Sequence, residues 1–308
     1  MAIKNFLLWL CVASVVLACQ SAPKTRSTSA PEAPLAVGPS PTTATPTKTE
    51  PTRDEAKKVA VILGPGGAKA YAHIGVLKAL EQQRIPIEKV IGLEWGALIG
   101  GLYAAKGINS VEWKLYKMEQ RGLPLPKGFF AKKLGDNSIK IMDDFFADAF
   151  ERDDIGNSKI PFECPSRSVW TGVVNWQNRG LYKDAIRRCL SFPPLFKVQG
   201  TFIAGASQAQ EAIERLRGEG FNVIILVNVL GSALPVDQNG LLDNLDYVIL
   251  WQEVKRALSE AARSGVEVVN VDTSNFPMTQ FDAKKDIEAL GEVAGTKAAA
   301  ALVSKYGF

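Results

Sequence analysis

The chain has 308 residues and a net charge of +4, from 36 basic and 32 acidic residues. No long basic run with interleaved aromatic residues accompanies this small charge, so nucleic-acid binding has no support in the sequence. Because His73 is the only histidine, the sequence offers neither a multi-histidine metal site nor a serine-histidine-aspartate triad, and we expect no cofactor.

The N-terminus has the pattern of a secretory signal peptide. After Lys4, an apolar run from Phe6 to Ala18 ends at Cys19, and it is too short to span a membrane stably. The residues Val16-Leu17-Ala18-Cys19 resemble the lipobox of bacterial lipoproteins, in which the cysteine is acylated and becomes the mature N-terminus. An ordinary secreted protein and an uncleaved anchor are the alternatives, and each of them places the rest of the chain outside the cytoplasm.

This resemblance predicts three segments: a signal peptide at 1–18, a tether at 19–56 and a domain at 57–308. The tether is rich in Pro, Thr and Ser and has almost no large apolar residue, so we expect it to be disordered. Gln20 stands where aspartate would favour the inner membrane, so we expect a lipid anchor in the outer membrane, with the protein in the cell envelope facing the periplasm. An oxidising compartment permits a disulfide between Cys164 and Cys189, but their spacing alone does not show one.

The domain alternates short apolar runs with amphipathic stretches. Strands are predicted at 58–63, 89–91 and 221–227, with further candidates at 245–251 and 266–271. Helices are predicted at 70–83, from 96 onward, at 139–150, at 208–218 and at 282–306, the last broken near Gly291 and Gly295. This order predicts an α/β fold of three layers, with a largely parallel central sheet between helices.

Several motifs, in order, resemble the patatin-like phospholipase family. Gly66, Gly67, Ala68 and Lys69 look like the family's oxyanion loop, and Gly92-Leu93-Glu94-Trp95-Gly96 lies where the family has its G-x-S-x-G nucleophile elbow. The segment Phe192-Pro193-Pro194-Leu195-Phe196 resembles the family's proline loop, and Ala204-Gly205-Ala206 falls at its aspartate motif. The resemblance covers nearly the whole domain and implies a lipid acyl hydrolase fold.

The two catalytic positions of that family are altered here. The resemblance implies a serine nucleophile at position 94 and an aspartate base at position 204, where this chain has Glu94 and Ala204. Loss of either partner removes the activation of a weak hydroxyl nucleophile. Pro65 also replaces the first glycine of the loop and has no N–H to donate, while Gly66, Gly67 and Ala68 keep theirs. No catalytic pair is therefore intact.

Gly92 and Gly96 remain, so the strained elbow can still form and would place Glu94 at a helix N-terminus. We hypothesise that the Glu94 carboxylate folds into the oxyanion hole and fills it as a permanent internal anion. Lys69 either neutralises Glu94 or is solvated. His73 is interpreted as a packing residue of the first helix.

Other interpretations remain open. Glu94 could itself be a nucleophile or a general base, and Asp237, in the turn at 236–242, could be a displaced aspartate, although it lies in the wrong register. The Trp, Phe and Leu residues from Trp113 to Phe130, with Phe145, Phe146 and Phe150, could form a lipid-facing lip, but core packing is the more frequent role of such residues.

We therefore expect a patatin-like lipoprotein without catalysis that binds a lipid, a fatty acyl group or an envelope protein. The alternative is an active lipid acyl hydrolase, a phospholipase or esterase, whose rearranged site uses Glu94, Asp237 or a mid-chain serine.

Overall fold

The computed structural model describes residues 57–121, 138–231 and 245–308, with side chains described only to residue 118 in the first range. All of these residues belong to one compact unit, Asp54–Phe308. The unit contains every described helix and strand and the hydrophobic core, so it has what a domain needs to fold independently. The predicted signal peptide, Cys19, the tether and the turn containing Asp237 lie outside the described residues.

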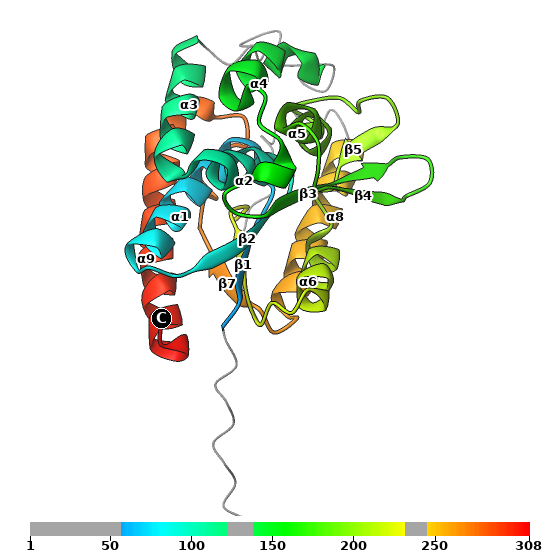
Figure 1. The fold of residues 1–308 in the computed structure, drawn as a ribbon. Coiled ribbons are helices and arrows are strands. Elements are labelled where there is room, and N and C mark those ends of the chain that lie inside the picture. Colours follow the sequence, from blue (N-terminus) through cyan, green and yellow to red (C-terminus); the bar gives the residue numbers. More distant parts are fainter. Residues whose placement is uncertain (1–56, 122–137, 232–244) are drawn as a thin grey trace, which may run out of the picture. The chain divides into compact units, whose positions relative to one another are not determined.

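A seven-stranded sheet forms the centre of the described part of the chain (Figure 1). Its order is β4-β3-β2-β1-β6-β7, with β5 pairing with β3 off this path. The strands are β1 (Val59–Leu63), β2 (Ile87–Gly92), β3 (Phe162–Ser168), β4 (Val174–Gln177), β5 (Phe202–Ala204), β6 (Val223–Asn228) and β7 (Glu267–Asn270). The pairs from β3 through β2, β1 and β6 to β7 are parallel, whereas β4 and β5 run antiparallel to β3.

Helices cover both sides of the sheet. In Figure 1, α1 and α9 lie on one side of β1 and β2, and α6 and α8 lie on the other. The helices are α1 (Ala72–Gln82), α2 (Trp95–Lys106), α3 (Ile108–Arg121), α4 (Asp143–Phe150), α5 (Tyr182–Leu190), α6 (Ala209–Gly218), α8 (Leu245–Ala262) and α9 (Lys284–Tyr306), with short 3-10 helices at η1 (Gly67–Tyr71), η3 (Ile139–Met142), η4 (Ile155–Asn157) and η5 (Phe281–Ala283). The predicted α/β fold with a largely parallel sheet is confirmed.

The central strands are buried on both faces, as continuous apolar runs predict. All five residues of β1 are buried, and so are five of the six residues of β6. Each strand therefore reads as an apolar run without alternation. Because parallel strands end at the same edge, the loops that follow β1, β2, β6 and β7 converge on one side of the sheet.

The prediction of a strand at 245–251 is wrong, because these residues begin helix α8. The buried side chains of α8 are Trp251, Val254, Leu258 and their neighbours, at spacings of three and four residues, whereas Leu245 and Ile249 are exposed. The apolar, β-branched composition of the first turns hid this helical period.

The predicted break in the last helix is also wrong, because α9 is continuous from Lys284 to Tyr306. Its glycines are contact points with α1. A Cβ at Gly291 would collide with the backbone of Ala72, and a Cβ at Gly295 would lie 2.8 Å from the Cα of Val76. Gly75 on α1 faces the backbone of α9 in the same way. These glycines are therefore required by close helix packing.

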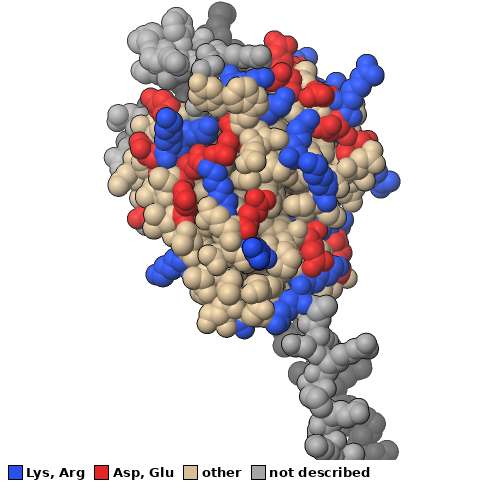
Figure 2. All heavy atoms as spheres, turned by 60° about the vertical axis from the view of Figure 1, so that its left-hand side comes forward, with Lys and Arg blue, Asp and Glu red and all other residues tan. Residues whose placement is uncertain are grey.

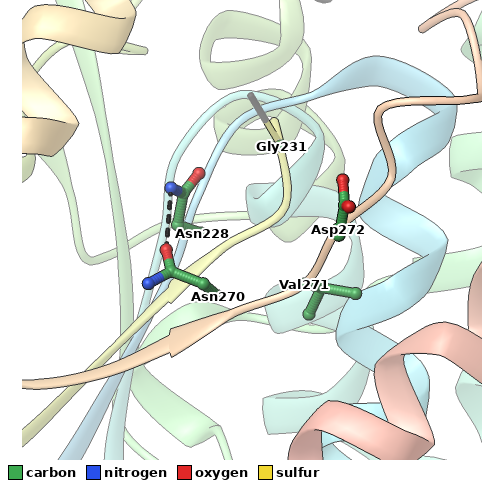
Figure 3. Close-up of a pocket in the computed structure, with 5 residues that line it drawn as sticks. All are labelled: Asn228, Gly231, Asn270, Val271 and Asp272. Carbon is green, nitrogen blue, oxygen red and sulfur yellow. Dashed lines mark hydrogen bonds between the residues drawn. The ribbon is translucent and has the colours of Figure 1, made fainter. Parts of the chain in front are cut away.

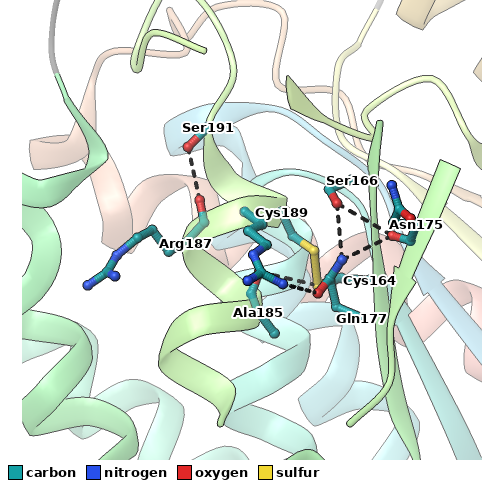
Figure 4. Close-up of a disulfide and its surroundings, with 9 residues drawn as sticks. Cys164, Ser166, Asn175, Gln177, Ala185, Arg187, Cys189 and Ser191 are labelled. Atoms are coloured by element: carbon teal, nitrogen blue, oxygen red, sulfur yellow. Dashed lines mark hydrogen bonds between the residues drawn. A yellow bond between two sulfur atoms is a disulfide. The ribbon is translucent and has the colours of Figure 1, made fainter. Parts of the chain in front are cut away.

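A disulfide joins Cys164 on β3 to Cys189 on α5, with 6.0 Å between the Cα atoms (Figure 4). The sequence permitted this bond without establishing it. Helix α5 leads through Phe192 and the following prolines to β5, which ends at Ala204. The bond therefore fixes to the sheet the segment that carries one of the two altered positions.

None of the described helices combines the length and apolar character needed to cross a membrane.

Candidate functional site

The turn between β2 and α2 places Glu94 at the edge of the sheet. Glu94 is the N-cap of α2 and has φ 52° and ψ −122°, a conformation that non-glycine residues rarely adopt. A Cβ at Gly92 would collide with the backbone of Ala97, and one at Gly96 would collide with the carbonyl of Leu63. Only glycine at both positions lets the strand turn directly into the helix, as in a nucleophile elbow.

The Glu94 carboxyl group is fully buried and accepts three backbone hydrogen bonds through one oxygen. Its Oε2 receives the N–H groups of Gly66 at 2.9 Å, Gly67 at 3.1 Å and Trp95 at 2.7 Å. The contacts with Gly66 and Gly67 are those that the sequence predicted. The third donor, Trp95, is the first residue of α2, which agrees with the expected place of Glu94 at a helix N-terminus.

The charge of Glu94 depends on pH. Burial raises the pKa of the carboxyl group to about 7, outweighing the three N–H donors, which lower it. The other oxygen, Oε1, is buried and has no hydrogen-bond partner in the described part of the chain. Glu94 is therefore a neutral acid below about pH 7 and an anion above it. The hypothesis of a permanent internal anion is too strong for this site.

The glycine loop offers fewer donors than the sequence indicated. The N–H of Ala68 donates to the carbonyl of Met278 at 2.7 Å, and that of Lys69 donates to the carbonyl of Gly66 at 3.1 Å. Pro65 has no N–H. The donors of this loop that face the elbow are therefore those of Gly66 and Gly67, and the prediction for Ala68 is wrong.

Lys69 follows neither of its two predicted roles. Its side chain is buried, and Nζ donates to the carbonyl oxygens of Leu230 at 3.2 Å and Thr273 at 2.9 Å. Burial lowers the pKa of the amine to about 8, with Lys255 lowering it further and Asp272 opposing them. Among the described residues it forms no ion pair with Glu94. Lys69 instead ties the glycine loop to the segments that follow β6 and β7.

His73 has a structural role, in agreement with its interpretation as a packing residue. Its Nε2 lies 2.7 Å from the carbonyl of Gly64, at the start of the glycine loop. Burial lowers the pKa of the imidazole to about 4, so the ring is neutral and Nε2 carries the proton that it donates. His73 therefore fixes α1 to the loop.

Ala204 ends β5 and is buried beside β3. It pairs with Ser166 in the sheet, and its N–H donates to the carbonyl of Ser191 at 2.9 Å. The hydroxyl of Ser191 donates to the carbonyl of Arg187, and the hydroxyl of Ser166 accepts from the amide of Gln177. Neither of these mid-chain serines has a carboxylate or imidazole partner in the hydrogen bonds of the described residues.

A serine and an aspartate do meet in the segment after β7. The hydroxyl of Ser274 donates to Oδ1 of Asp272 at 2.5 Å, and Lys69 binds the intervening Thr273. The hydroxyl and backbone N–H of Ser274 lower the pKa of the Asp272 carboxyl group below its usual value, with a smaller contribution from Lys69. A carboxylate that is already stabilised in this way is a weak base. A displaced catalytic pair would also need a serine hydroxyl bonded to a carboxylate. The low basicity of Asp272 makes this pair more typical of a surface turn.

A pocket of about 290 Å³ lies next to this turn, at the carboxyl ends of β6 and β7 (Figure 3). It is lined by Asn228, Gly231, Asn270, Val271 and Asp272, and the amides of Asn228 and Asn270 bond to each other at 3.1 Å. Its polar lining does not suit an acyl chain. Both asparagines end apolar strands, a signal in the sequence that could have placed them at this edge.

The residues proposed as a lipid-facing lip divide into two groups. Phe146 and Phe150 are buried in the core, and Phe145 packs against it, as the packing interpretation predicts. Trp113 and Tyr116 are exposed on α3 and stack on each other. Leu115 is buried as well, and the Phe and Leu residues from 122 to 130 lie outside the described residues. Within the described ranges, no three His, Cys, Asp or Glu side chains are grouped so that they could hold a metal ion.

The fold and the elbow define a class of protein: an α/β protein of the hydrolase type, in which a strained turn after a parallel strand presents one side chain to backbone N–H donors. A family model, patatin-like phospholipase, matches residues 61–221, just over half of the chain. The chain belongs to the patatin-like phospholipase family.

Two relatives illustrate the extent of the similarity. An uncharacterized NTE family protein of Mycobacterium bovis is 28% identical over 187 residues, which are 57% of this chain and 50% of that protein. A lysophospholipase of Neurospora crassa is 26% identical over 181 residues, which are 56% of this chain and 12% of that protein. The chain thus matches half or less of the length of these relatives.

Among solved structures, the crystal structure of VipD from Legionella pneumophila is similar to this chain with a TM-score of 0.47 and 11% identity. The superposition covers 81% of this chain and 67% of that one.

The raised pKa of Glu94 predicts a pH-dependent stability. The carboxyl group titrates near 4.5 in the unfolded chain and near 7 in the folded one, so the folded state holds the proton more tightly. This stabilisation is fully present below pH 4.5 and is lost as the pH rises through about 7. Relative to Glu94→Gln, the free energy of unfolding of the wild type should fall by about 2 kcal/mol between about pH 5 and pH 8.

Urea unfolding of both proteins across this range measures the difference. The glutamine keeps an acceptor oxygen and a similar size but does not titrate, and the contributions of His73 and Lys69 cancel because both proteins contain them. If the free energies of unfolding of the wild type and of Glu94→Gln changed equally with pH, Glu94 would not titrate near neutral pH.

Proposed function

We propose that this protein is a patatin-like domain without ester hydrolysis that serves as a binding module in the cell envelope. Its ligand is a lipid or fatty acyl group, or a protein partner, held near the altered elbow. The proposal concerns the described unit, because the chain matches only part of the length of its relatives.

One observation carries this proposal: a glutamate occupies the donors that would hold an oxyanion. In acyl hydrolases the N–H groups of the loop and of the residue after the elbow stabilise the negative oxygen of the tetrahedral intermediate. Here Oε2 of Glu94 accepts from Gly66, Gly67 and Trp95. A substrate carbonyl would have to displace a buried carboxyl group, and Ala204 supplies no base for any hydroxyl placed at the elbow.

The disulfide supports the location in the envelope. Disulfides form and persist in oxidising compartments such as the bacterial periplasm, and are rare in the cytosol. The bond between Cys164 and Cys189 is therefore consistent with export by the N-terminal segment and with anchoring at Cys19.

An active hydrolase with a rearranged site is the second candidate, and Ser274 against Asp272 is the observation that favours it. The lowered pKa of Asp272 argues against it, because a weak base activates a hydroxyl poorly. Glu94 acting as a nucleophile is the other form of this candidate. Its Oε1, which has no hydrogen-bond partner among the residues that the structure describes, is the atom that would attack.

Hydrolysis of short-chain and long-chain esters separates the two candidates. We expect the wild type to show no turnover above the uncatalysed rate and no labelling by a fluorophosphonate probe for activated serines. Glu94→Ser combined with Ala204→Asp should gain hydrolysis of about 100-fold or more over either single variant, because a nucleophile and its base act together. Wild-type turnover that Glu94→Ala or Ser274→Ala abolishes would establish an active enzyme.

Retention of a ligand tests the binding module. We expect organic extraction of the purified wild-type protein, followed by mass spectrometry, to release a lipid or fatty acid that an equal amount of an unrelated periplasmic protein does not. If the extracts contained no lipid or fatty acid, the lipid-binding form of the proposal would be wrong and only binding of a protein partner would remain.

Replacement of Cys19 tests the anchor. In the source bacterium we expect Cys19→Ser to abolish incorporation of radiolabelled palmitate and to shift the processing of the N-terminal segment. Cys11→Ser, which changes a cysteine within the predicted signal peptide, is the matched control and should leave labelling intact. Equal labelling of both variants would contradict acylation at Cys19.

A further inference from the structure

The turn between β3 and β4 exposes three apolar side chains. This hairpin tip, residues 169–173, presents Trp170 at 81% exposure, Val173 at 56% and Val169 at 45%. In Figure 1 the hairpin of β3 and β4 extends away from the body of the domain, on the side opposite α3 and α9. No part of the elbow or of the pocket uses these residues, so the exposure of the tip is unexplained by the site.

Four of the five backbone N–H groups of the hairpin tip donate hydrogen bonds within the protein. The N–H of Val169 donates to the carbonyl of Thr201, and the N–H of Gly172 donates to the carbonyl of Ser168. The N–H of Thr171 donates to the hydroxyl of Ser168, and the N–H of Val173 donates to the hydroxyl of Thr171. Unpaired N–H groups make it costly for a loop to enter an apolar medium, because they lose their bonds with water. The tip avoids most of this cost.

Positive charge is concentrated in the part of the chain that carries the tip. Residues 164–210 contain six basic residues and one acidic residue, Asp184, so their net charge is +5 and that of the remaining chain is −1. By contrast, acidic and basic side chains are interspersed over the face shown in Figure 2. Of these six basic residues, Arg187 is ion-paired with Asp143 and Asp184, whereas Arg167 and Lys197 are exposed.

Two of these basic residues lie close to the tip. Nη2 of Arg167 is 3.5 Å from the position that a Cβ of Gly172 would take, which places the guanidinium against the turn. Lys197 is exposed in the loop whose Thr201 carbonyl accepts from Val169. Neither cation has an ion-pair partner within the described ranges.

We propose that the hairpin tip docks on the surface of an anionic phospholipid bilayer, with Trp170 in the interface and Arg167 and Lys197 against the headgroup phosphates. Tryptophan favours the membrane interface, because its ring is apolar and its indole N–H remains close to water. Basic residues near an anionic surface add about 1 kcal/mol each. Three side chains on one turn are too few for a stable protein interface, which buries about 800 Å² per partner. This docking needs neither the lipid anchor nor the elbow.

Flotation with vesicles tests the docking on the compact unit that begins at Asp54, so that no anchor contributes. We expect binding to vesicles of phosphatidylglycerol and phosphatidylethanolamine in equal parts, and much weaker binding to phosphatidylcholine alone. Trp170→Ser should lower the partition coefficient about tenfold. Arg167→Gln and Lys197→Gln should lower it about fivefold each, and added salt should reduce these two differences.

Matched variants isolate the tip. Trp113→Ser makes the same change on the distant helix α3. The double variant Lys285→Gln, Lys297→Gln removes two exposed charges on α9. Both control proteins should bind vesicles as the wild type does. The substituted tip residues are exposed, so thermal unfolding should be unchanged. Equal losses in Trp170→Ser and Trp113→Ser, or no vesicle binding at all, would overturn the proposal. A dimer that only Trp170→Ser dissolves, without vesicle binding, would assign the tip to a second copy instead.

Discussion

Three backbone N–H groups converge on one oxygen of a buried carboxyl group, and the arrangement of the site follows from this contact. The N–H groups of Gly66 and Gly67 come from the loop after β1, and that of Trp95 from the first turn of α2. An oxyanion hole in a hydrolase is built from such donors, which wait for a charge that develops only during the reaction. Here the chain itself supplies the acceptor, from the position where a nucleophile would stand.

The elbow remains strained although the hydroxyl is absent. Glu94 keeps a positive φ, and Gly92 and Gly96 allow an approach of strand and helix that any Cβ would prevent. Such strain costs on the order of 1–3 kcal/mol and persists only where the surroundings enforce it. The three hydrogen bonds to Glu94 offset part of this cost. These hydrogen bonds therefore help to hold the elbow in its strained geometry.

Burial decides the chemistry of the titratable groups around the loop. Glu94, Lys69 and His73 all lie in the interior, and burial shifts the pKa of each toward its neutral form. None of the three forms an ion pair with another residue of the described ranges. At neutral pH the His73 ring is therefore neutral, Glu94 is partly ionised and Lys69 is mostly protonated.

Local signals in the sequence were sufficient for the elements that hold the elbow. The apolar runs of β1 and β6, the glycines of the turn and the positions of Glu94 and Ala204 are all readable from neighbouring residues. Non-local contacts were not readable. The acceptors of Lys69 lie 161 and 204 positions away along the chain, and Met278, which takes the N–H of Ala68, is equally remote. The β-branched residues in the first turns of α8 favour a strand locally, and only packing of its buried face shows the helix. The glycines of α9 favour a break locally, and only their contacts with α1 show why the helix continues.

The most direct test of this account is a pH titration of the backbone amides by nitrogen-15 NMR. If Oε2 of Glu94 accepts from Gly66, Gly67 and Trp95, all three amide resonances should shift with one common midpoint near pH 7, and the shifts should disappear in Glu94→Gln. Amides of Gly66 and Gly67 that exchange freely with water and show no common titration would mean that the donors are open. The central claim, that this chain fills its own oxyanion hole, would then be wrong.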